Sequence, residues 1–396
     1  MALGALETLE GRATPVAAAL RRAAEAVAAP AVCFLAARLV VALTLALVDR
    51  GRDPVTAIHP LPWPVAPGSG RLVDLLGTWD AGWYVHLAAH GYTTSLDPPN
   101  GFSAGMAFFP LLPLLIRMVS HLGPSPLAAG AILVAAVGLA DAVLLRRLCL
   151  ELTGDRGWAD RAVLLWCLWP GAYVLSLVYA EGLTVLLALV CLLSLARRRW
   201  LAAGVAAALA TATQPDALAL VAGCAWAAAS AVRRGDRRSL IAPVLAPAGF
   251  LAYMGWLWSA TGHPDAWYVV EGHFWKGGLD IHGATVGLVS RFLAAPSAPD
   301  NWVPLAGVAF VVVAGLALRR MRPPAPVVLF AAGVVVSAMA SGPVGLRPRF
   351  LLVAFPLVIA VAGWARGWRL PVVAVASVVL LGWLTALTSA GLVLTP

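Results

Sequence analysis

Apolar runs of about 20 residues recur along almost the whole chain and are separated by short polar segments. A helix of that length crosses roughly 30 Å of hydrocarbon, because an α-helix rises about 1.5 Å per residue. The pattern predicts eleven spans, at residues 28–48, 126–147, 162–179, 182–196, 200–214, 217–232, 240–258, 302–318, 325–341, 350–365 and 371–394. We therefore expect an all-α polytopic membrane protein with about eleven transmembrane helices.

The composition agrees with a membrane protein. Hydrophobic residues make up 61% of the 396 residues and charged residues only 12%, about half the share typical of soluble domains. The net charge of +9 is carried by clusters between apolar runs, a pattern that orients membrane helices. We therefore expect membrane lipids, and no nucleic acid, as partners. The five cysteines form no CxxC pair and are interpreted as packing residues.

A twelfth apolar run, residues 107–122, decides the topology. If this run does not cross the membrane, 19 of the 28 lysines and arginines lie on one side and eight on the other, with Arg38 inside the first span. If it crosses, all later clusters change sides. The positive-inside rule favours the first arrangement, with a cytoplasmic N-terminus. Pro110 and Pro113 also suit a helix that bends at the membrane surface.

In this arrangement the chain is one transmembrane domain, residues 1–396, in the cell (plasma) membrane. Its two long loops lie outside the cytoplasm. The first, residues 49–125, carries interfacial helices, and the second covers residues 259–301. Functional groups are often displayed on long loops. We therefore expect an extracytoplasmic active site.

The first outer loop contains an acidic residue in an aromatic setting, Trp79-Asp80-Ala81-Gly82-Trp83, before a short predicted helix at residues 83–89. Asp80 has two interpretations that are compatible. It is either a helix N-cap, or a general base whose proton affinity is tuned by partial burial.

Several motifs resemble those of the PIG-V family, which comprises GPI mannosyltransferase 2 and its bacterial relatives in the GT-C class of membrane glycosyltransferases. The matching residues are Trp79-Asp80-Ala81, His90-Gly91-Tyr92, Ala107-Phe108-Phe109-Pro110, Tyr179-Ala180-Glu181, Thr213-Gln214-Pro215-Asp216, Thr261-Gly262-His263-Pro264, Arg349-Phe350 and Phe355-Pro356. The resemblance covers roughly residues 30–360. The chain departs from the family pattern at Gln214, His263 and Phe350, where arginine, aspartate and tyrosine are common.

The resemblance implies a GT-C-like fold and a bacterial glycosyltransferase without a cofactor. It implies inverting transfer of a mannose-type sugar from a polyprenyl-phosphate donor to a hydroxyl acceptor on a glycan, glycolipid or glycoprotein. It also implies that Asp80 is the catalytic base. The leaving phosphate needs cationic donors, and arginine forks suit it. Arg349 is the first choice for donor phosphate binding and Arg347 the second, since both precede the tenth predicted span.

Four further candidates have a supporting or substrate-binding role as one interpretation. Arg38 lies mid-span, where a charge indicates either function or a structural ion pair. Glu181 either holds acceptor hydroxyls or pairs with an arginine. Asp216 is a candidate site residue or the N-cap of the sixth span. His90 is interpreted as orienting Asp80 or the loop backbone.

Trp79 and Tyr92 belong to the matched motifs and complete the set of candidate substrate-binding or supporting residues. Lys276 is interpreted as an interfacial anchor or a contact of the lipid phosphate. The seven histidines show no metal-binding spacing and Asp80 has no adjacent second carboxylate, so we expect no metal.

Two alternatives stay open. A lipid-linked-sugar flippase or transporter would spread ionisable residues along its spans, where this chain has only Arg38 and Asp141 as clear cases. A GT-C enzyme that uses another sugar, such as glucose or arabinose, would share every motif above.

Overall fold

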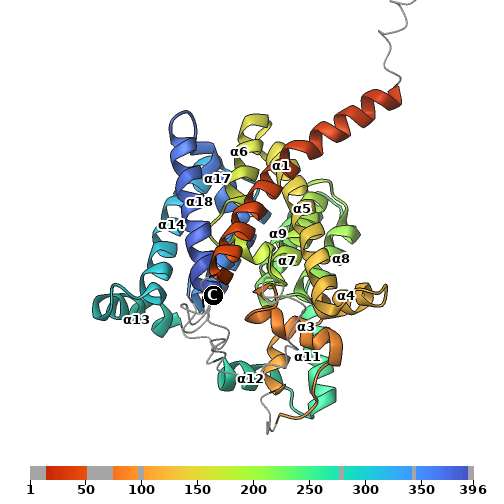
Figure 1. The fold of residues 1–396 in the computed structure, drawn as a ribbon. Coiled ribbons are helices and arrows are strands. Elements are labelled where there is room, and N and C mark those ends of the chain that lie inside the picture. Colours follow the sequence, from red (N-terminus) through yellow and green to blue (C-terminus); the bar gives the residue numbers. More distant parts are fainter. Residues whose placement is uncertain (1–14, 51–74, 97–101, 276–280, 341–344, 391–396) are drawn as a thin grey trace, which may run out of the picture.

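The computed structural model describes residues 15–50, 75–96, 102–275, 281–340 and 345–390 (Figure 1). Within these ranges the protein is helical and contains no β-strand. The longer helices are α1 (Pro15–Arg50), α3 (Asp80–His90), α4 (Leu111–Ser120), α5 (Pro126–Thr153), α6 (Arg156–Cys167), α7 (Glu181–Ala196), α8 (Trp200–Thr211), α9 (Ala219–Val232), α11 (Ala248–Thr261), α12 (Ala266–Phe274), α13 (Ile281–Ala294), α14 (Pro299–Met321), α15 (Ala325–Ala340), α17 (Phe355–Trp364) and α18 (Arg369–Ser389). Shorter pieces are η1 (Phe102–Ala107), η2 (Ala172–Leu175), η3 (Pro215–Leu218), η4 (Arg237–Leu240), α10 (Ile241–Leu245) and α16 (Pro348–Val353).

The all-helical membrane fold is confirmed. Among the described residues, six apolar helical segments are long enough to cross a bilayer: Ala26–Arg50, Pro126–Thr153, Pro215–Val232, Arg237–Thr261, Asn301–Met321 and Arg369–Ser389. Helical structure is present at the other five predicted spans too, but in shorter pieces. The chain is thus a polytopic membrane protein, and the count of eleven crossings stays a prediction.

Three predicted spans are not continuous α-helices, and in the span at residues 240–258 α10 ends at Leu245 and α11 begins at Ala248. Instead of one helix over residues 162–179, α6 ends at Cys167 and the chain continues through the short η2. Instead of one helix over residues 350–365, α16 and α17 meet at Ala354. Pro170 and Pro356 follow these last two breaks, and proline cannot donate the N–H that a continuous helix requires. At membrane depth, irregular backbone is tolerated where protein buries it or where it lines a cavity.

The short helices α3 and α4, from residues 75–96 and 102–125, lie with α12 in a layer at one end of the bundle (Figure 1). α3 begins at Asp80, three residues before the predicted helix. α4 has ten residues, so it is about 15 Å long, half the thickness of the hydrocarbon. Its length agrees with the predicted non-crossing segment. Residues 51–74 and 97–101 of the first long loop, and Lys276 in the second, lie outside the described residues.

We expect both flanks of α4 to be accessible from outside the cell. Thr94 before it and His121 after it are exposed, whereas Ser103 is buried and unsuitable as a probe. Cysteine at position 94 or 121, in a background without native cysteines, should react with an impermeant thiol reagent in intact cells. Labelling of position 121 only after the cells are opened would contradict the topology.

Candidate active site

Asp80 is held at the start of α3 by an unusual backbone conformation. Trp79, the preceding residue, has φ +58°, a region that non-glycine residues seldom adopt. Its indole N–H donates to the carbonyl of Thr388 in α18 at 3.0 Å, which fixes the turn from the far end of the sequence. Strain of this kind persists only where the surroundings enforce it, and it is frequent at active sites. Trp79 therefore positions Asp80 and ties α3 to α18.

The N-cap interpretation of Asp80 is wrong. The cap position of α3 is Trp79, Asp80 is the first residue of the helix, and no side chain caps this end. The carboxylate instead accepts a hydrogen bond from Arg349, with 2.7 Å between Arg349 Nη1 and Asp80 Oδ2. Only 13% of the Arg349 side chain and 18% of the Asp80 side chain are exposed. The two residues most strongly favoured from sequence, 269 positions apart, thus form one largely buried ion pair.

Glu181 completes a cluster of two carboxylates around one guanidinium. It is the first residue of α7, its side chain is 1% exposed, and its Oε1 lies 3.5 Å from Arg349 Nε. Neither carboxylate oxygen receives a hydrogen bond from the residues that the structure describes. The interpretation of Glu181 as an arginine partner is therefore supported by geometry. Buried polar groups are normally hydrogen-bonded, so these two oxygens are also available to accept a hydrogen bond from the hydroxyl of a bound molecule.

The guanidinium of Arg349 is held on its faces as well as at its edge. Its carbon lies 5.4 Å from the ring centroid of Tyr179 and 4.6 Å from that of Phe350. Such cation–π contacts are worth about 0.5–2 kcal/mol each, depending on exposure. The Tyr179-Ala180-Glu181 and Arg349-Phe350 motifs therefore meet at one point in space.

Asp216 approaches the same cluster from η3. Its Oδ1 accepts a hydrogen bond from Ser337 of α15 at 2.9 Å, and the charge of Arg349 acts on it. The cap of η3 is Gln214, so Asp216 does not cap this segment. Gln214 accepts a hydrogen bond from Thr184, one turn after Glu181, at 3.0 Å. The Thr213-Gln214-Pro215-Asp216 motif is therefore fixed to the start of α7.

The two other candidate arginines lie in α1 and directly before α16. Arg38 in α1 donates to the carbonyls of Ala172 and Cys167 and to the hydroxyl of Ser176, at 2.6, 3.3 and 2.8 Å. These bonds satisfy the carbonyl groups that the break between α6 and η2 leaves without helical partners, so Arg38 supports the wall of the site. Arg347 is 4% exposed and directly precedes α16.

His90 and Tyr92 lie away from Asp80. His90 is exposed at the opposite end of α3, about 15 Å along the helix, and its ring lies 4.8 Å from that of His86. The interpretation that His90 orients Asp80 is therefore wrong. The hydroxyl of Tyr92 donates to the carbonyl of Phe108 at 2.8 Å, which joins the end of α3 to the Phe108-Phe109-Pro110 segment.

The helix α12, from the long loop at residues 259–301, covers this layer. In α12, the indole N–H of Trp267 donates to the carbonyl of Ala107, and that of Trp275, directly after the helix, donates to the carbonyl of Ala104, both at 3.3 Å. The Trp275 ring also meets Trp83 of α3 edge-on, with 6.3 Å between centroids. Aromatic side chains from residues 49–125 and 259–301 thus pack together, and we call this cluster, which includes Trp83, Trp267 and Trp275, the aromatic enclosure.

Sequence analysis missed Glu271, which lies midway between these tryptophans. Positions four residues apart share a helix face, so Glu271 lies on the face of α12 that Trp267 and Trp275 turn toward η1. Burial and, to a lesser extent, the negative charge of Asp80 together raise the pKa of Glu271 to about 7. The periodicity of α12 was visible in the sequence, but its proximity to Asp80 was not.

We expect Glu271 to give the activity a pH dependence near neutrality. Below pH 7 its carboxyl is protonated, and above pH 7 it carries a negative charge facing Asp80. A like charge makes a carboxylate a stronger base, so turnover should rise as the pH passes through about 7. The rise should disappear from the pH profile of Glu271→Gln. An unchanged inflection in this variant would exclude Glu271 as its source.

Together, these residues form a site that can bind and deprotonate a hydroxyl. It contains an Asp–Arg pair, a buried glutamate with free acceptor capacity and an aromatic enclosure. Among the described residues, no group of three His, Cys, Asp or Glu side chains is arranged to hold a metal ion.

One comparison with known proteins matches the part of the chain that carries several of these site residues. Residues 59–229 match the family model described as mannosyltransferase (PIG-V). The match includes Asp80, Glu181 and Asp216, and it ends before Glu271 and Arg349. No curated protein matches the chain.

Proposed function

We propose that this membrane protein, whose residues 59–229 match the family model of mannosyltransferase (PIG-V), transfers a mannose-type sugar from a polyprenyl-phosphate donor to a hydroxyl acceptor. The transfer takes place on the extracytoplasmic side, with inversion at the anomeric carbon. The observation that carries this proposal is the buried ion pair between Asp80 and Arg349, where a base and a cation lie side by side.

Asp80 acts as the general base. As the acceptor oxygen forms its bond to the anomeric carbon, the hydroxyl proton moves to the Asp80 carboxylate. The bond from that carbon to the phosphate oxygen breaks, and its electron pair stays on the departing polyprenyl phosphate. One displacement of this kind inverts the configuration. The ion pair with Arg349 holds the carboxylate in place, and Glu181 accepts a hydrogen bond from another acceptor hydroxyl.

The leaving phosphate gains charge during the same step, and a preorganised cation stabilises that charge. Arg349 is suited to this role because its planar fork can serve two anions at once. It bonds Asp80 through Nη1 and shares its charge with the arriving phosphate. Arg347, two residues earlier and directly before α16, is the second cation available to the donor.

The main alternative is a flippase or transporter of lipid-linked sugars. The charged side chains described above favour an enzyme, because they gather at one point and do not line a path through the bundle. A GT-C enzyme specific for glucose or arabinose is the second alternative, since no residue described here reads the sugar.

One assay separates these functions. Purified protein in detergent is incubated with a membrane lipid extract and with polyprenyl phosphates carrying radiolabelled mannose, glucose or arabinose. We expect label from the mannose donor in the acceptor fraction. Label from another sugar alone would reassign the donor. In liposomes, movement of the intact labelled donor across the bilayer without any transfer would establish the transporter.

We expect activity to survive EDTA. The carboxylate of Asp80 already has a cationic partner in Arg349, so the site does not require a divalent ion to balance its charge. Transfer rates measured before and after chelation should agree. Loss of activity with EDTA, followed by recovery with manganese or magnesium, would show that a metal takes part.

A further inference from the structure

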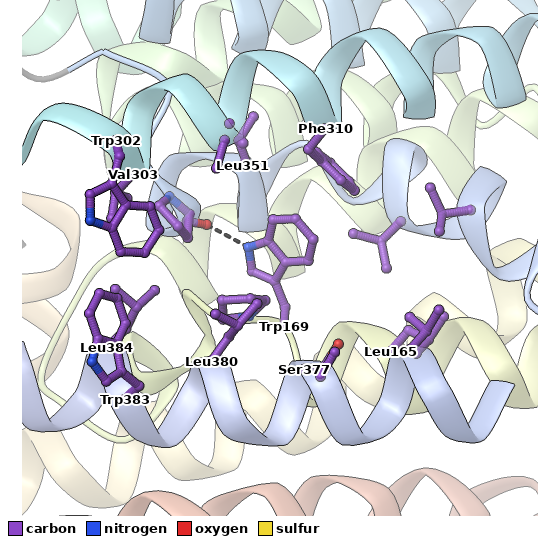
Figure 2. A pocket seen from close by; sticks show the side chains of 18 of the residues that line it. Leu165, Trp169, Trp302, Val303, Phe310, Leu351, Ser377, Leu380, Trp383 and Leu384 are labelled. Carbon is purple, nitrogen blue, oxygen red and sulfur yellow. Dashed lines mark hydrogen bonds between the residues drawn. The ribbon is translucent and has the colours of Figure 1, made fainter. Parts of the chain in front are cut away.

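An apolar cavity of about 360 Å³ is lined in part by Pro348 and Leu351 of α16. Figure 2 shows the side chains that line it. It runs between α14 and α18, with α6 and α17 behind it. Trp302 and Trp383 stack at one end with 5.1 Å between centroids, and Leu165 and Phe310 lie toward the other. Ser377 is the only aliphatic hydroxyl among the side chains that line it. A sugar or phosphate would find almost no hydrogen-bonding partner there, whereas a hydrocarbon chain needs none.

The cavity and the catalytic cluster share one short helix as a wall. Pro348 and Leu351 of α16 face the cavity, and Arg349, between them in sequence, bonds Asp80. The carbonyl of Pro348 accepts a hydrogen bond from the indole of Trp169 at 2.6 Å, so the wall is fixed from the cavity side. The backbone of Gly171 also lies against Pro348 so closely that a Cβ would clash at 2.3 Å. One short helix, α16, therefore separates the cavity from the Asp80–Arg349 pair.

The charges on α16 and α12 decide which substrate lies against the cavity. The cations Arg347 and Arg349 stand at the N-cap and inside α16, the helix that forms the cavity wall. α12 presents Glu271, whose carboxyl feels the charge of Asp80, and the aromatic enclosure. A phosphate is attracted to the cations of α16 and repelled from Glu271, so the lipid-linked phosphate belongs with the cavity and the acceptor with α12.

We propose that the cavity between α14 and α18 binds the isoprenoid segment of the lipid-phosphate donor that lies next to its phosphate. This assignment rests on the proposed function. Ligand pockets usually measure about 300–1,000 Å³, so 360 Å³ accommodates a part of a polyprenyl chain, and the remainder extends into the bilayer.

Filling the cavity tests the assignment. Ala306 of α14 and Ala376 of α18 line it and have exposed side chains, so Ala306→Trp and Ala376→Trp have room for the larger side chain. Val312 and Val379 lie on the same two helices, are 58% and 62% exposed and do not line the cavity. Val312→Trp and Val379→Trp are therefore matched controls for added bulk on each helix.

Each variant is assayed with a long-chain polyprenyl-phosphate mannose and with a short geranyl-type phosphate mannose. We expect the cavity variants to raise KM for the long-chain donor about tenfold, the effect of losing a few buried methylene contacts. KM for the short donor should rise less, and the control variants should match the wild type. This selective loss is not expected from general damage to the fold.

The possible results separate the two levels of the proposal. Equal KM values for cavity and control variants would overturn the cavity assignment and leave the glycosyltransferase intact, as expected if only bulk lipid occupies the cavity. An equal loss with both donors would also overturn it. Absence of transfer from any donor by the wild-type protein would overturn the proposed function, and the cavity assignment with it.

Discussion

Asp80→Asn should lower the turnover number for sugar transfer by at least about a hundredfold, because the loss of a general base commonly costs 10²–10⁴. The asparagine side chain has nearly the same shape, and its carbonyl oxygen can still accept the hydrogen bond from Arg349 Nη1 that Asp80 Oδ2 accepts now. The variant should therefore express and fold like the wild type. The comparison is made with purified protein and saturating donor and acceptor.

A second Asp–Arg pair supplies the control. Asp160 in α6 bonds Arg146 at 2.6 Å and is remote from the catalytic cluster. The Asp160 side chain is 46% exposed, so this pair is less buried than Asp80–Arg349, and Asp160→Asn reports the cost of losing one charge from an Asp–Arg pair away from the cluster. We expect turnover of this variant to be near normal. Near-normal turnover of Asp80→Asn, or an equal decrease in both variants, would reject Asp80 as the base.

Arg349→Ala should reduce kcat/KM by roughly 10²–10³, as the loss of one preorganised charge donor usually does. The variant should raise KM for the lipid donor and lower kcat, because the charge on the leaving phosphate grows in the transition state. It also leaves Asp80 and Glu181, two largely buried carboxylates, without their common cation. KM for the acceptor should change little.

The conservative variant distinguishes charge from geometry. Arg349→Lys keeps the positive charge but loses the planar fork and the face-on contacts with Tyr179 and Phe350, so it should recover only part of the activity. Arg347→Ala should be milder in both parameters. If Arg349→Ala changes only acceptor affinity, or if Arg347 is the more damaging loss, the phosphate site is assigned to the wrong residue.

The membrane class, the approximate span positions and the main candidates were predictable from local information. Apolar runs and their lengths depend only on neighbouring residues, and a bilayer imposes the same length on every span. The motifs around Asp80, Glu181, Asp216 and Arg349 were likewise visible as short blocks. The helix breaks inside the spans were less predictable. A proline such as Pro170 or Pro356 breaks a helix only where neighbouring segments satisfy the backbone groups that the break leaves without partners.

Only the tertiary structure shows which of these sequence motifs lie next to one another. Sequence reasoning placed Asp80 and Arg349 in separate roles, and packing brings them to 2.7 Å across 269 positions. One of its two interpretations of His90, that His90 orients Asp80, is excluded by the axis of α3. It also passed over Glu271, which only the docking of α12 brings near the site. Local sequence determines which segments enter the membrane and which residues carry charge. Contacts between distant segments determine which charges share a buried space, since burial and proximity arise only when the helices pack.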